Sequence, residues 1–348
     1  MHLKDFTEIV QEAWADYDPK RSVLTCLDIS ARVSTNHVYL LTLEDNTKVI
    51  GKLSYFGHFE NFVEDHRLIN ALSINLPAPY EYFVSQSLTK KGQLFTYRHS
   101  DSMLDAWVVF YKPMRVDQML PKKLDLPMIR KLGSELALFH KASISVANVL
   151  PDWSKTLQSD LTHLLEILET DDGKYEHRGN IDVIKKQIKI FQEESLKLGT
   201  DQWTSIPVFV DWNIGNFSVS KDGAFYSRWD YDWFRMSSRM MDFYFFSRVC
   251  STVGDNTVFS YRIDPLMEDR FLEFLKAYHQ VYPITENEIL FLKEAYRFFI
   301  LNYVIKDGRY FFHEIYASQL QREAFEIYIP QIDTFDPSKI IRTLIGKT

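Results

Sequence analysis

The sequence predicts an α+β protein with two lobes: an N-terminal antiparallel sheet lobe with one large helix, and a mostly helical C-terminal lobe. Strand-like alternation of apolar and polar residues dominates the first third of the chain, whereas helical spacing dominates after Lys112 and Pro113. We therefore expect residues 1–111 to form the first lobe and residues 112–348 the second, with the proline-marked step between them as a hinge.

The composition excludes several classes of function. The chain has 348 residues, 46% of them hydrophobic and 25% charged, which suits a folded protein with sizeable cores. A net charge of −7, with acids and bases interspersed, argues against nucleic acid or an anionic membrane as partner. No apolar run approaches the roughly 18 residues of a membrane span, and the first residues lack a signal-peptide core. Two distant cysteines, Cys26 and Cys250, suit a reducing compartment, so we expect a cytoplasmic protein.

The first lobe is expected to contain a hairpin, one large helix and two further strands. The hairpin turns at Glu44-Asp45-Asn46, between two runs in which apolar and polar residues alternate. Pro77 and Pro79 close the helix that follows. The strands and the helix are expected at residues 38–43, 48–53, 59–72, 82–85 and 106–111.

The second lobe is expected to be helical around a small strand-rich island at residues 208–229, with a polar stretch at 171–179. Aromatic residues reach 15% of the chain, and many follow residue 225. They predict either an aromatic core or an aromatic-walled substrate pocket. The helices are expected at residues 127–142, 157–168, 181–198, 238–249, 267–278, 286–304 and 312–328.

The strand-rich island carries the residues with the clearest chemistry. Asp211 follows the apolar run 208–210, and Asn216 comes five residues later. This spacing fits a loop in which a carboxylate accepts the proton of a reacting hydroxyl and an amide oxygen binds Mg²⁺. A turn at Gly223 returns the chain to Asp230, a further hard oxygen ligand of the type that Mg²⁺ prefers.

These residues resemble those of the aminoglycoside phosphotransferase, choline/ethanolamine kinase and homoserine kinase superfamily. The loop of that family reads His-Gly-Asp-Leu-His-Pro-Gly-Asn and precedes an Ile-Asp-Trp-like metal motif and a later Asp. Asp211, Gly215 and Asn216 match the loop, Asp230 matches the metal motif, and Asp242 matches the later Asp. Three further segments are similar to the family in the same order: Asn36–Tyr39, Leu76–Pro79 and Leu132–His140.

The resemblance implies a protein-kinase-like fold and an ATP- and Mg²⁺-dependent O-phosphotransferase acting on a small hydroxylated metabolite or antibiotic-like acceptor. It implies that Asp211 is the catalytic base and that Asn216 and Asp230 bind the metal. Asp242 is expected to brace the catalytic loop from the start of a helix.

Nucleotide contacts are expected from the first lobe. Lys52, at the end of the third strand, is the candidate for gripping the α and β phosphates. An acid on the following helix should hold this lysine. We favour Glu64 over Asp65 because its longer side chain reaches an ion pair more easily, and Glu60 is a more remote candidate.

Adenine and substrate contacts complete the expected site. The segment around Phe110 and Lys112 resembles the strand and hinge that bind adenine through backbone groups. Asp232 and Trp233 are candidate substrate contacts, and Tyr244 and Phe245 are candidate pocket walls.

The catalytic loop departs from the family pattern at several positions. Phe209 and Val210 stand where the family has His-Gly, and Asn213 and Ile214 stand where it has His-Pro. An alternative is therefore a catalytically degenerate, nucleotide-binding pseudokinase of the same fold. A glycosidase with two acidic residues ranks lower, because it gives Asn216 and Lys52 no role. The residues do not choose between ATP and GTP, or among aminoglycoside, amino alcohol, amino acid and sugar acceptors.

Overall fold

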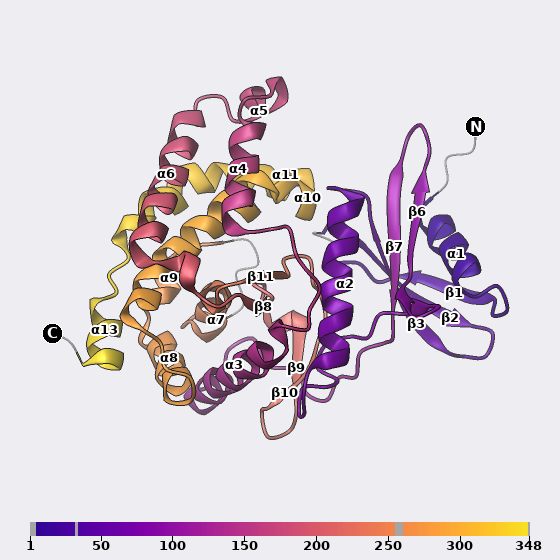
Figure 1. Cartoon of the computed structure of the whole chain (residues 1–348), viewed down its shortest axis with the longest axis horizontal. Coiled ribbons are helices and arrows are strands. Elements are labelled where there is room, and N and C mark those ends of the chain that lie inside the picture. Colours follow the sequence, from indigo (N-terminus) through magenta and orange to yellow (C-terminus); the bar gives the residue numbers. More distant parts are fainter. Residues whose placement is uncertain (1–4, 32–33, 255–259, 347–348) are drawn as a thin grey trace.

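The computed structural model describes residues 5–31, 34–254 and 260–346 and has the predicted α+β architecture. An N-terminal sheet with two helices lies beside a larger helical part (Figure 1). A single connection links them, from Tyr111 at the end of the last sheet strand to the first helix at Leu126. The expected domain boundary at residues 111 and 112 falls at the start of this connection and stays a prediction.

Five antiparallel strands form the N-terminal sheet in the order β1-β2-β3-β7-β6. The hairpin predicted from alternation is confirmed, because β2 and β3 pair with Val38 opposite Lys52. Asn46 takes a positive φ of 62° in its turn. The five strands are β1 (Val23–Asp28), β2 (His37–Leu43), β3 (Lys48–Ser54), β6 (Thr96–Ser100) and β7 (Asp105–Tyr111), and β4 (Thr89–Lys90) and β5 (Gln93–Leu94) form a separate short ladder.

Two helices cover opposite faces of this sheet (Figure 1). α1 (Phe6–Tyr17) begins with a capping box at Asp5 and buries its apolar face against one side of the sheet. α2 (Phe59–Asn75), the helix predicted at 59–72, lies between the other face and the helical part. Neighbouring residues of β7 therefore face different cores: Phe110 packs on the α1 side and Tyr111 on the α2 side.

The helical part forms around the packing of α3 (Leu126–Ala147) against α8 (Asp269–Val281). A Cβ added to Gly133 would lie 2.3 Å from the carbonyl oxygen of Phe274, so this close approach requires glycine. The other helices are α4 (Leu157–Ile167), α5 (Asp171–Glu176), α6 (Ile181–Leu198), α7 (Phe243–Cys250), α9 (Glu286–Phe299), α10 (Gly308–Phe311), α11 (Glu314–Glu323), α12 (Ile329–Gln331) and α13 (Ser338–Ile345).

The strand-rich island forms two short two-stranded ladders between α6 and α7. β9 (Phe217–Val219) pairs with β10 (Phe225–Arg228), and β8 (Ile206–Val208) pairs with β11 (Arg235–Ser237). The two pairs flank the loop that contains Asp211 and the loop that contains Asp230. The island therefore holds both candidate loops on one rigid base.

Five predicted elements need correction. The run Tyr82–Ser85 is not a strand; it makes one isolated bridge, between Val84 and Arg228, because its apolar side chains pack against the helical part. The polar stretch at 171–179 contains α5. The helix expected at 238–249 begins as a 3₁₀ turn over Arg239–Asp242. The last turns of the helices expected at 286–304 and 312–328 are π-helical, over Ile300–Lys306 and Ala324–Tyr328.

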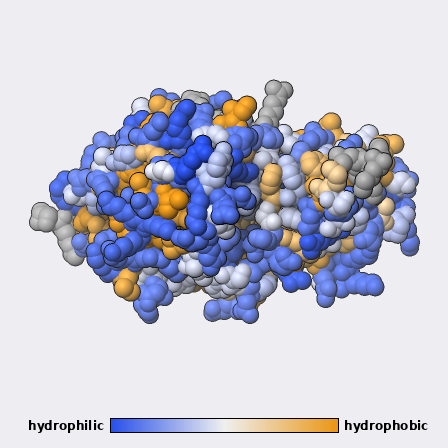
Figure 2. Space-filling view, turned by 90° about the horizontal axis from the view of Figure 1, so that it is seen from above, coloured by the Kyte–Doolittle hydropathy of each residue, from blue (hydrophilic) through white to orange (hydrophobic). Residues whose placement is uncertain are grey.

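The aromatic residues after 225 are mostly core residues, as the packing interpretation predicts. Many are almost fully buried, including Phe243, Phe245, Tyr296 and Phe299. The face of the molecule in Figure 2 is largely hydrophilic, with hydrophobic residues gathered in patches over the helical part. Within the described ranges, no helix is both long enough and apolar enough to cross a membrane.

Two sets of contacts connect the N-terminal part, which contains the sheet and α2, to the helical part. On one side, Ser154 and Lys155, which precede α4, hold acids of α2. On the other side, the backbone N–H of Thr35 donates to the carbonyl oxygen of Phe311 at 3.3 Å, and its hydroxyl donates to the carbonyl oxygen of Tyr310. These contacts set the separation of the two parts around the candidate site.

Candidate active site

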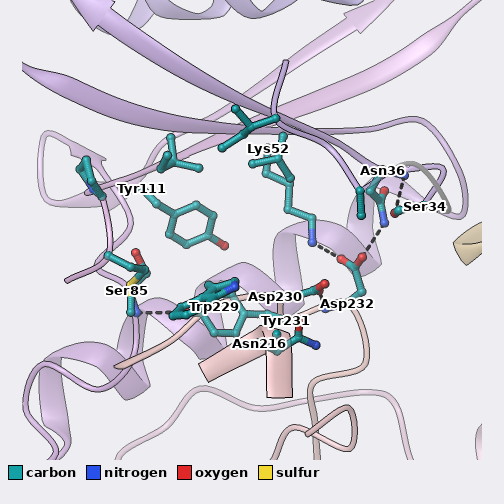
Figure 3. A pocket seen from close by; sticks show the side chains of 17 residues that line it. Ser34, Asn36, Lys52, Ser85, Tyr111, Asn216, Trp229, Asp230, Tyr231 and Asp232 are labelled. Atoms are coloured by element: carbon teal, nitrogen blue, oxygen red, sulfur yellow. Dashed lines mark hydrogen bonds and ion pairs between the residues drawn. The ribbon is translucent and has the colours of Figure 1, made fainter. Parts of the chain in front are cut away.

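A cavity of about 490 Å³ lies between the sheet and the helical part (Figure 3). The sheet supplies an apolar surface and Lys52 on one side of the cavity. The last residue of β7, Tyr111, and the segment after it, with Pro113 and Met114, supply the edge. The island supplies the opposite wall, made of Gly215, Asn216 and residues 229–232. The remaining lining residues are Ile29, Ala31, Ser34, Asn36, Val38, Ile50 and Ser85.

The loop before Asp211 has an unusual backbone. The N–H of Asp211 donates to the carbonyl oxygen of Phe209 at 2.7 Å, which closes a tight three-residue turn around Val210. Val210 has a φ of 63°, a conformation that a β-branched residue rarely adopts. The family that the sequence resembles has glycine at this position, where positive φ carries no steric cost.

A buried carboxylate holds this strained turn. Oδ1 of Asp242 accepts hydrogen bonds from the backbone N–H groups of Phe209 at 2.9 Å and Val210 at 2.7 Å. Its other oxygen lies 2.9 Å from Nε2 of His140, whose Nδ1 lies 2.8 Å from the hydroxyl of Tyr278. The predicted bracing role of Asp242 is therefore confirmed, and the partner His140 on α3 was not predicted.

Asp211 and Asn216 lie together, as predicted from their spacing. Nδ2 of Asn216 donates to Oδ2 of Asp211 at 2.9 Å, and the N–H of Asn213 donates to Oδ1 at 3.2 Å. Burial, and then the charge of Asp230, raise the pKa of Asp211 to about 7. A carboxyl group with this pKa can accept a proton near neutral pH.

Asp230 faces the cavity at the end of β10, beside Asn216 (Figure 3). Burial and the adjacent Asp232 carboxylate raise the pKa of Asp230. A bound divalent cation offsets the repulsion between neighbouring carboxylates, and Mg²⁺ prefers carboxylate and amide oxygens. The donor set of Asn216 and Asp230 therefore fits the predicted Mg²⁺ ion.

Lys52 points from β3 across the cavity toward the island, but its partner differs from the one predicted. Its ammonium group pairs with the carboxylate of Asp232, and Asp232 is therefore a lysine partner in this structure, where a substrate contact was expected. Burial lowers the pKa of Lys52, but the charges of Asp232 and Asp230 outweigh burial and the net shift is upward. The lysine stays charged.

The acids of α2 are engaged elsewhere, so the predicted pair of Lys52 with Glu64 is not present. Oε1 of Glu64 accepts hydrogen bonds from the N–H of Ser154 at 2.8 Å and from its hydroxyl at 3.1 Å. Asp65 forms an ion pair with Lys155 at 2.5 Å. The charge of Asp65 also raises the pKa of Lys52, but less than the charges of Asp232 and Asp230 do. Sequence reasoning could not find Ser154 and Lys155, which stand in no motif.

The adenine contacts expected at Phe110 and Lys112 need adjustment. The ring of Phe110 faces the α1 core, and its carbonyl oxygen accepts a hydrogen bond from Leu88. The side chain and the N–H of Lys112 both bond to Gln86, at 2.8 and 2.9 Å. Neither residue lines the cavity, whereas their neighbours Tyr111 and Pro113 do.

The candidate pocket walls are core residues. Trp233 is 6% exposed and its ring packs against Phe245 and Tyr303, at centroid distances of 5.5 and 4.9 Å. Tyr244 and Phe245 are also buried. None of the three lines the cavity, because burial in the aromatic core is the stronger demand on such side chains.

Arg228 is a buried residue of the site that sequence reasoning missed. Its guanidinium lies over the rings of Phe209 and Trp212, at 4.4 and 4.6 Å. Nη2 donates to the carbonyl oxygen of Asp211 at 2.7 Å and more weakly to that of Asp230 at 3.4 Å. Arg228 therefore ties the two candidate loops together, and its only signal in the sequence is its position two residues before Asp230.

Val210→Gly is expected to be more stable to unfolding than Val210→Ala by about 1 kcal/mol, although glycine buries less surface, because only glycine adopts positive φ freely. Urea unfolding of both variants measures this difference. Val208→Gly and Val208→Ala, in the neighbouring strand β8, are the matched pair, and there alanine should be the more stable. If Val210→Ala were at least as stable as Val210→Gly, the turn would carry no strain.

The chain resembles solved small-molecule phosphotransferases in structure. Amicoumacin kinase, in complex with AMP-PNP, Ca²⁺ and Ami, has a TM-score of 0.61 at 14% identity and covers 97% of both chains. Microcompartment-associated aminopropanol kinase has a TM-score of 0.58 at 14% identity, with coverage of 91% of this chain and 94% of that chain. The GDP complex of aminoglycoside 2'-phosphotransferase-IIIa has a TM-score of 0.58 at 12% identity, with coverage of 95% and 100%.

Sequence comparison adds no closer relative. No protein-family model matches the chain, and no curated protein matches its sequence. At 12–14% identity, the structural likeness shows the fold. The predicted α+β fold, shared with solved aminoglycoside phosphotransferases and small-molecule kinases, is confirmed.

Proposed function

We propose that this chain, which has the fold of the small-molecule phosphotransferases, is an ATP- and Mg²⁺-dependent kinase that phosphorylates a hydroxyl group of a small molecule. One arrangement supports this proposal. Asn216 and Asp230 line one wall of the cavity, Asp211 contacts Asn216, and Lys52 reaches in from the opposite wall (Figure 3). Phosphoryl transfer between two oxygen atoms needs these parts and few others.

In the proposed reaction, the oxygen of the acceptor hydroxyl forms a bond to the γ-phosphorus, and Asp211 accepts the proton of that hydroxyl. The bond from the γ-phosphorus to the bridging oxygen breaks, and ADP leaves with that oxygen. Lys52 binds oxygens of the α and β phosphates. The donor is thereby held with its γ-phosphate directed toward the acceptor hydroxyl. Asn216 and Asp230 would hold Mg²⁺, which when bound neutralises charge on the phosphates.

The rest of the cavity suits a nucleotide base. Val38 and Ile50 supply an apolar surface from the sheet, and Tyr111, Pro113 and Met114 supply the edge where a kinase-like protein binds adenine. We propose ATP as the donor, with GTP assayed beside it, because a GDP complex is among the related structures. The acceptor is proposed to be a small hydroxylated molecule, and the two free thiols suit a cytoplasmic setting.

Thermal unfolding with and without millimolar MgATP tests the proposal. A ligand at about 100 times its dissociation constant stabilises a protein by about 2.7 kcal/mol, which is readily detected. The shift should require Mg²⁺ and weaken in Asp230→Asn. The control is Asp222→Asn, which removes an exposed carboxylate from the turn of the same hairpin. No shift in the wild type with either ATP or GTP would contradict the proposal.

A panel of hydroxylated acceptors then separates the kinase from the pseudokinase alternative, which rests on the altered loop at Phe209, Val210 and Asn213. The panel holds aminoglycosides, amino alcohols, amino acids and sugars, and ADP release is the measurement. Turnover that depends on both Mg²⁺ and one acceptor class supports the kinase. Metal-dependent nucleotide binding without turnover on any acceptor supports the pseudokinase.

A further inference from the structure

The carboxylate of Asp232 is held at both oxygens by side chains of the N-terminal part, Lys52 on β3 and Asn36 just before β2. Lys52 pairs with one oxygen, and the two side chains are only 10% and 20% exposed. Nδ2 of Asn36 donates to the other oxygen at 2.7 Å, and the hydroxyl of Ser54 donates to Oδ1 of Asn36 at 2.5 Å. Figure 3 shows the side chains of Lys52 and Asn36 converging on Asp232. Such a closed network fixes the direction of each member.

The helix that would otherwise supply a partner for the lysine is committed to other contacts. Oε1 of Glu64 accepts hydrogen bonds from Ser154, and Oδ2 of Asp65 pairs with Lys155, while Oδ1 of Asp65 is buried without a hydrogen-bond partner in the described part of the chain. Also on α2, Nδ1 of His66 lies 2.5 Å from the hydroxyl of Tyr111, which lines the cavity. Among the described residues, the ion-pair partner of Lys52 is therefore Asp232 and not an acid of α2.

We propose that Asp232 is a positioning residue that orients Lys52 toward the nucleotide phosphates, in place of a carboxylate on α2. This inference rests on the proposed function. The orientation of Lys52 then depends on the island loop that also contains Asp230, the candidate metal ligand two residues before Asp232. Asp232 in this role also joins the two walls of the cavity, since Lys52 belongs to β3, Asn36 directly precedes β2, and Asp232 lies in the island loop between β10 and β11.

The physical case is that a lysine side chain is flexible and needs a partner to point in one direction. Its four-carbon stem has many rotamers, and a nearly buried ammonium without a partner is costly. Asp232 supplies charge and direction together. Nucleotide phosphates can then bind to an ammonium group that is already in place, which lowers the entropy lost on binding.

A double-mutant cycle tests the proposal. The dissociation constant of a Mg²⁺-loaded, non-hydrolysable ATP analogue is measured by calorimetry for the wild type, Asp232→Asn, Lys52→Ala and the double variant. We expect Asp232→Asn to weaken binding about tenfold in the wild-type background and less than about twofold when Lys52 is absent, as for residues in direct contact. Asp232→Glu should recover part of the affinity, because a carboxylate is restored.

Three further variants make the result specific. Asn36→Ala, which leaves both charges in place, should weaken binding in the same direction but less. Asp65→Asn is the variant that an α2 partner would make defective, and we expect it to weaken binding far less than Asp232→Asn does. Asp222→Asn, an exposed carboxylate of the same hairpin, is the neutral control. Circular dichroism verifies that each variant is folded.

The outcomes separate this inference from the proposed function. If the wild type binds no nucleotide, the proposed function fails and the inference fails with it. If the wild type binds and Asp232→Asn weakens binding equally with and without Lys52, Asp232 acts on the metal or the ligand directly, and only the inference is overturned. A defect in Asp65→Asn with none in Asp232→Asn would return the role to α2.

Discussion

Asp211→Asn is expected to lower kcat about a thousandfold while MgATP still binds. A positioned general base contributes typically 10²–10⁴-fold, and asparagine cannot take up the proton of the acceptor hydroxyl. The substitution preserves the shape of the side chain and an oxygen that can accept the hydrogen bond of Asn216. Steady-state kinetics with the acceptor found in the panel measures kcat, and calorimetry measures the dissociation constant of the nucleotide.

Asp222→Asn is the matched control and should leave kcat unchanged. A loss of less than about tenfold in Asp211→Asn would mean that Asp211 is not the base. Loss of nucleotide binding in the same variant would place Asp211 among the groups that hold the donor, and the base would have to be sought elsewhere.

The same variant should also change how stability depends on pH in the metal-free protein. The pKa of Asp211 is raised to about 7 in the fold, above the ordinary value of 3.8. The folded protein therefore binds this proton where the unfolded chain does not. Its stabilising contribution is complete below about pH 4 and is lost as pH rises to about 7, at up to about 1.4 kcal/mol per pH unit. Asparagine lacks this titration.

We therefore expect the free energy of unfolding of the wild type, relative to Asp211→Asn, to fall between pH 4 and 7. Urea unfolding at several pH values, with a chelator present, measures it. Parallel pH profiles for the two proteins would show that the pKa of Asp211 is not raised. This readout needs no acceptor, so it tests the surroundings of Asp211 separately from the reaction.

The elements that the sequence predicted well depend on local patterns. The β2–β3 hairpin follows from alternation around an Asn-containing turn, and α6 begins and ends where its helical spacing does. Tyr82–Ser85 was predicted as a strand because it is short and apolar. It is apolar because it packs against residues more than 100 positions away, and its single bridge is to Arg228. Local periodicity carries no information about such packing.

The predictions for the candidate site also succeed where the residues are close in the sequence and fail where they are distant. The spacing of Asp211 and Asn216 within one loop predicted a contact that the structure contains. The predicted partner of Lys52 is wrong because Glu64 and Asp65 lie on α2, the next helix in the sequence, whereas the observed partner comes from a distant segment. Asp232 lies 180 positions along the chain from Lys52. Phe110 and Lys112 flank the residue that does line the cavity, because neighbouring strand residues face opposite sides of the sheet.

Asp242→Asn is expected to reduce the free energy of unfolding by about 3 kcal/mol. The carboxylate is fully buried, accepts two backbone N–H groups and contacts His140. Burial lowers the pKa of His140, so its ring is neutral. The neutral ring then donates from Nε2 to Asp242 and accepts at Nδ1 from Tyr278. An asparagine would turn its NH₂ group toward a donor on one side or the other, and breaking a buried charged contact costs about 3–5 kcal/mol.

The loss should extend to the catalytic loop, because Asp242 holds the N–H groups of Phe209 and Val210, the first two residues of the strained turn. Without that carboxylate, Val210 has less reason to keep a φ of 63°, and the backbone that presents Asp211 can relax. Asp242→Asn should therefore lower kcat even at temperatures where the variant is fully folded.

Urea unfolding measures the stability, and kinetics at low temperature measures kcat. Asp333→Asn, which removes the charge of a side chain that is 78% exposed, is the control and should change stability by less than about 1 kcal/mol. A loss of less than about 1 kcal/mol in Asp242→Asn as well would mean that the amide satisfies both sides, and that the loop owes its shape to Arg228 and the surrounding aromatic rings instead.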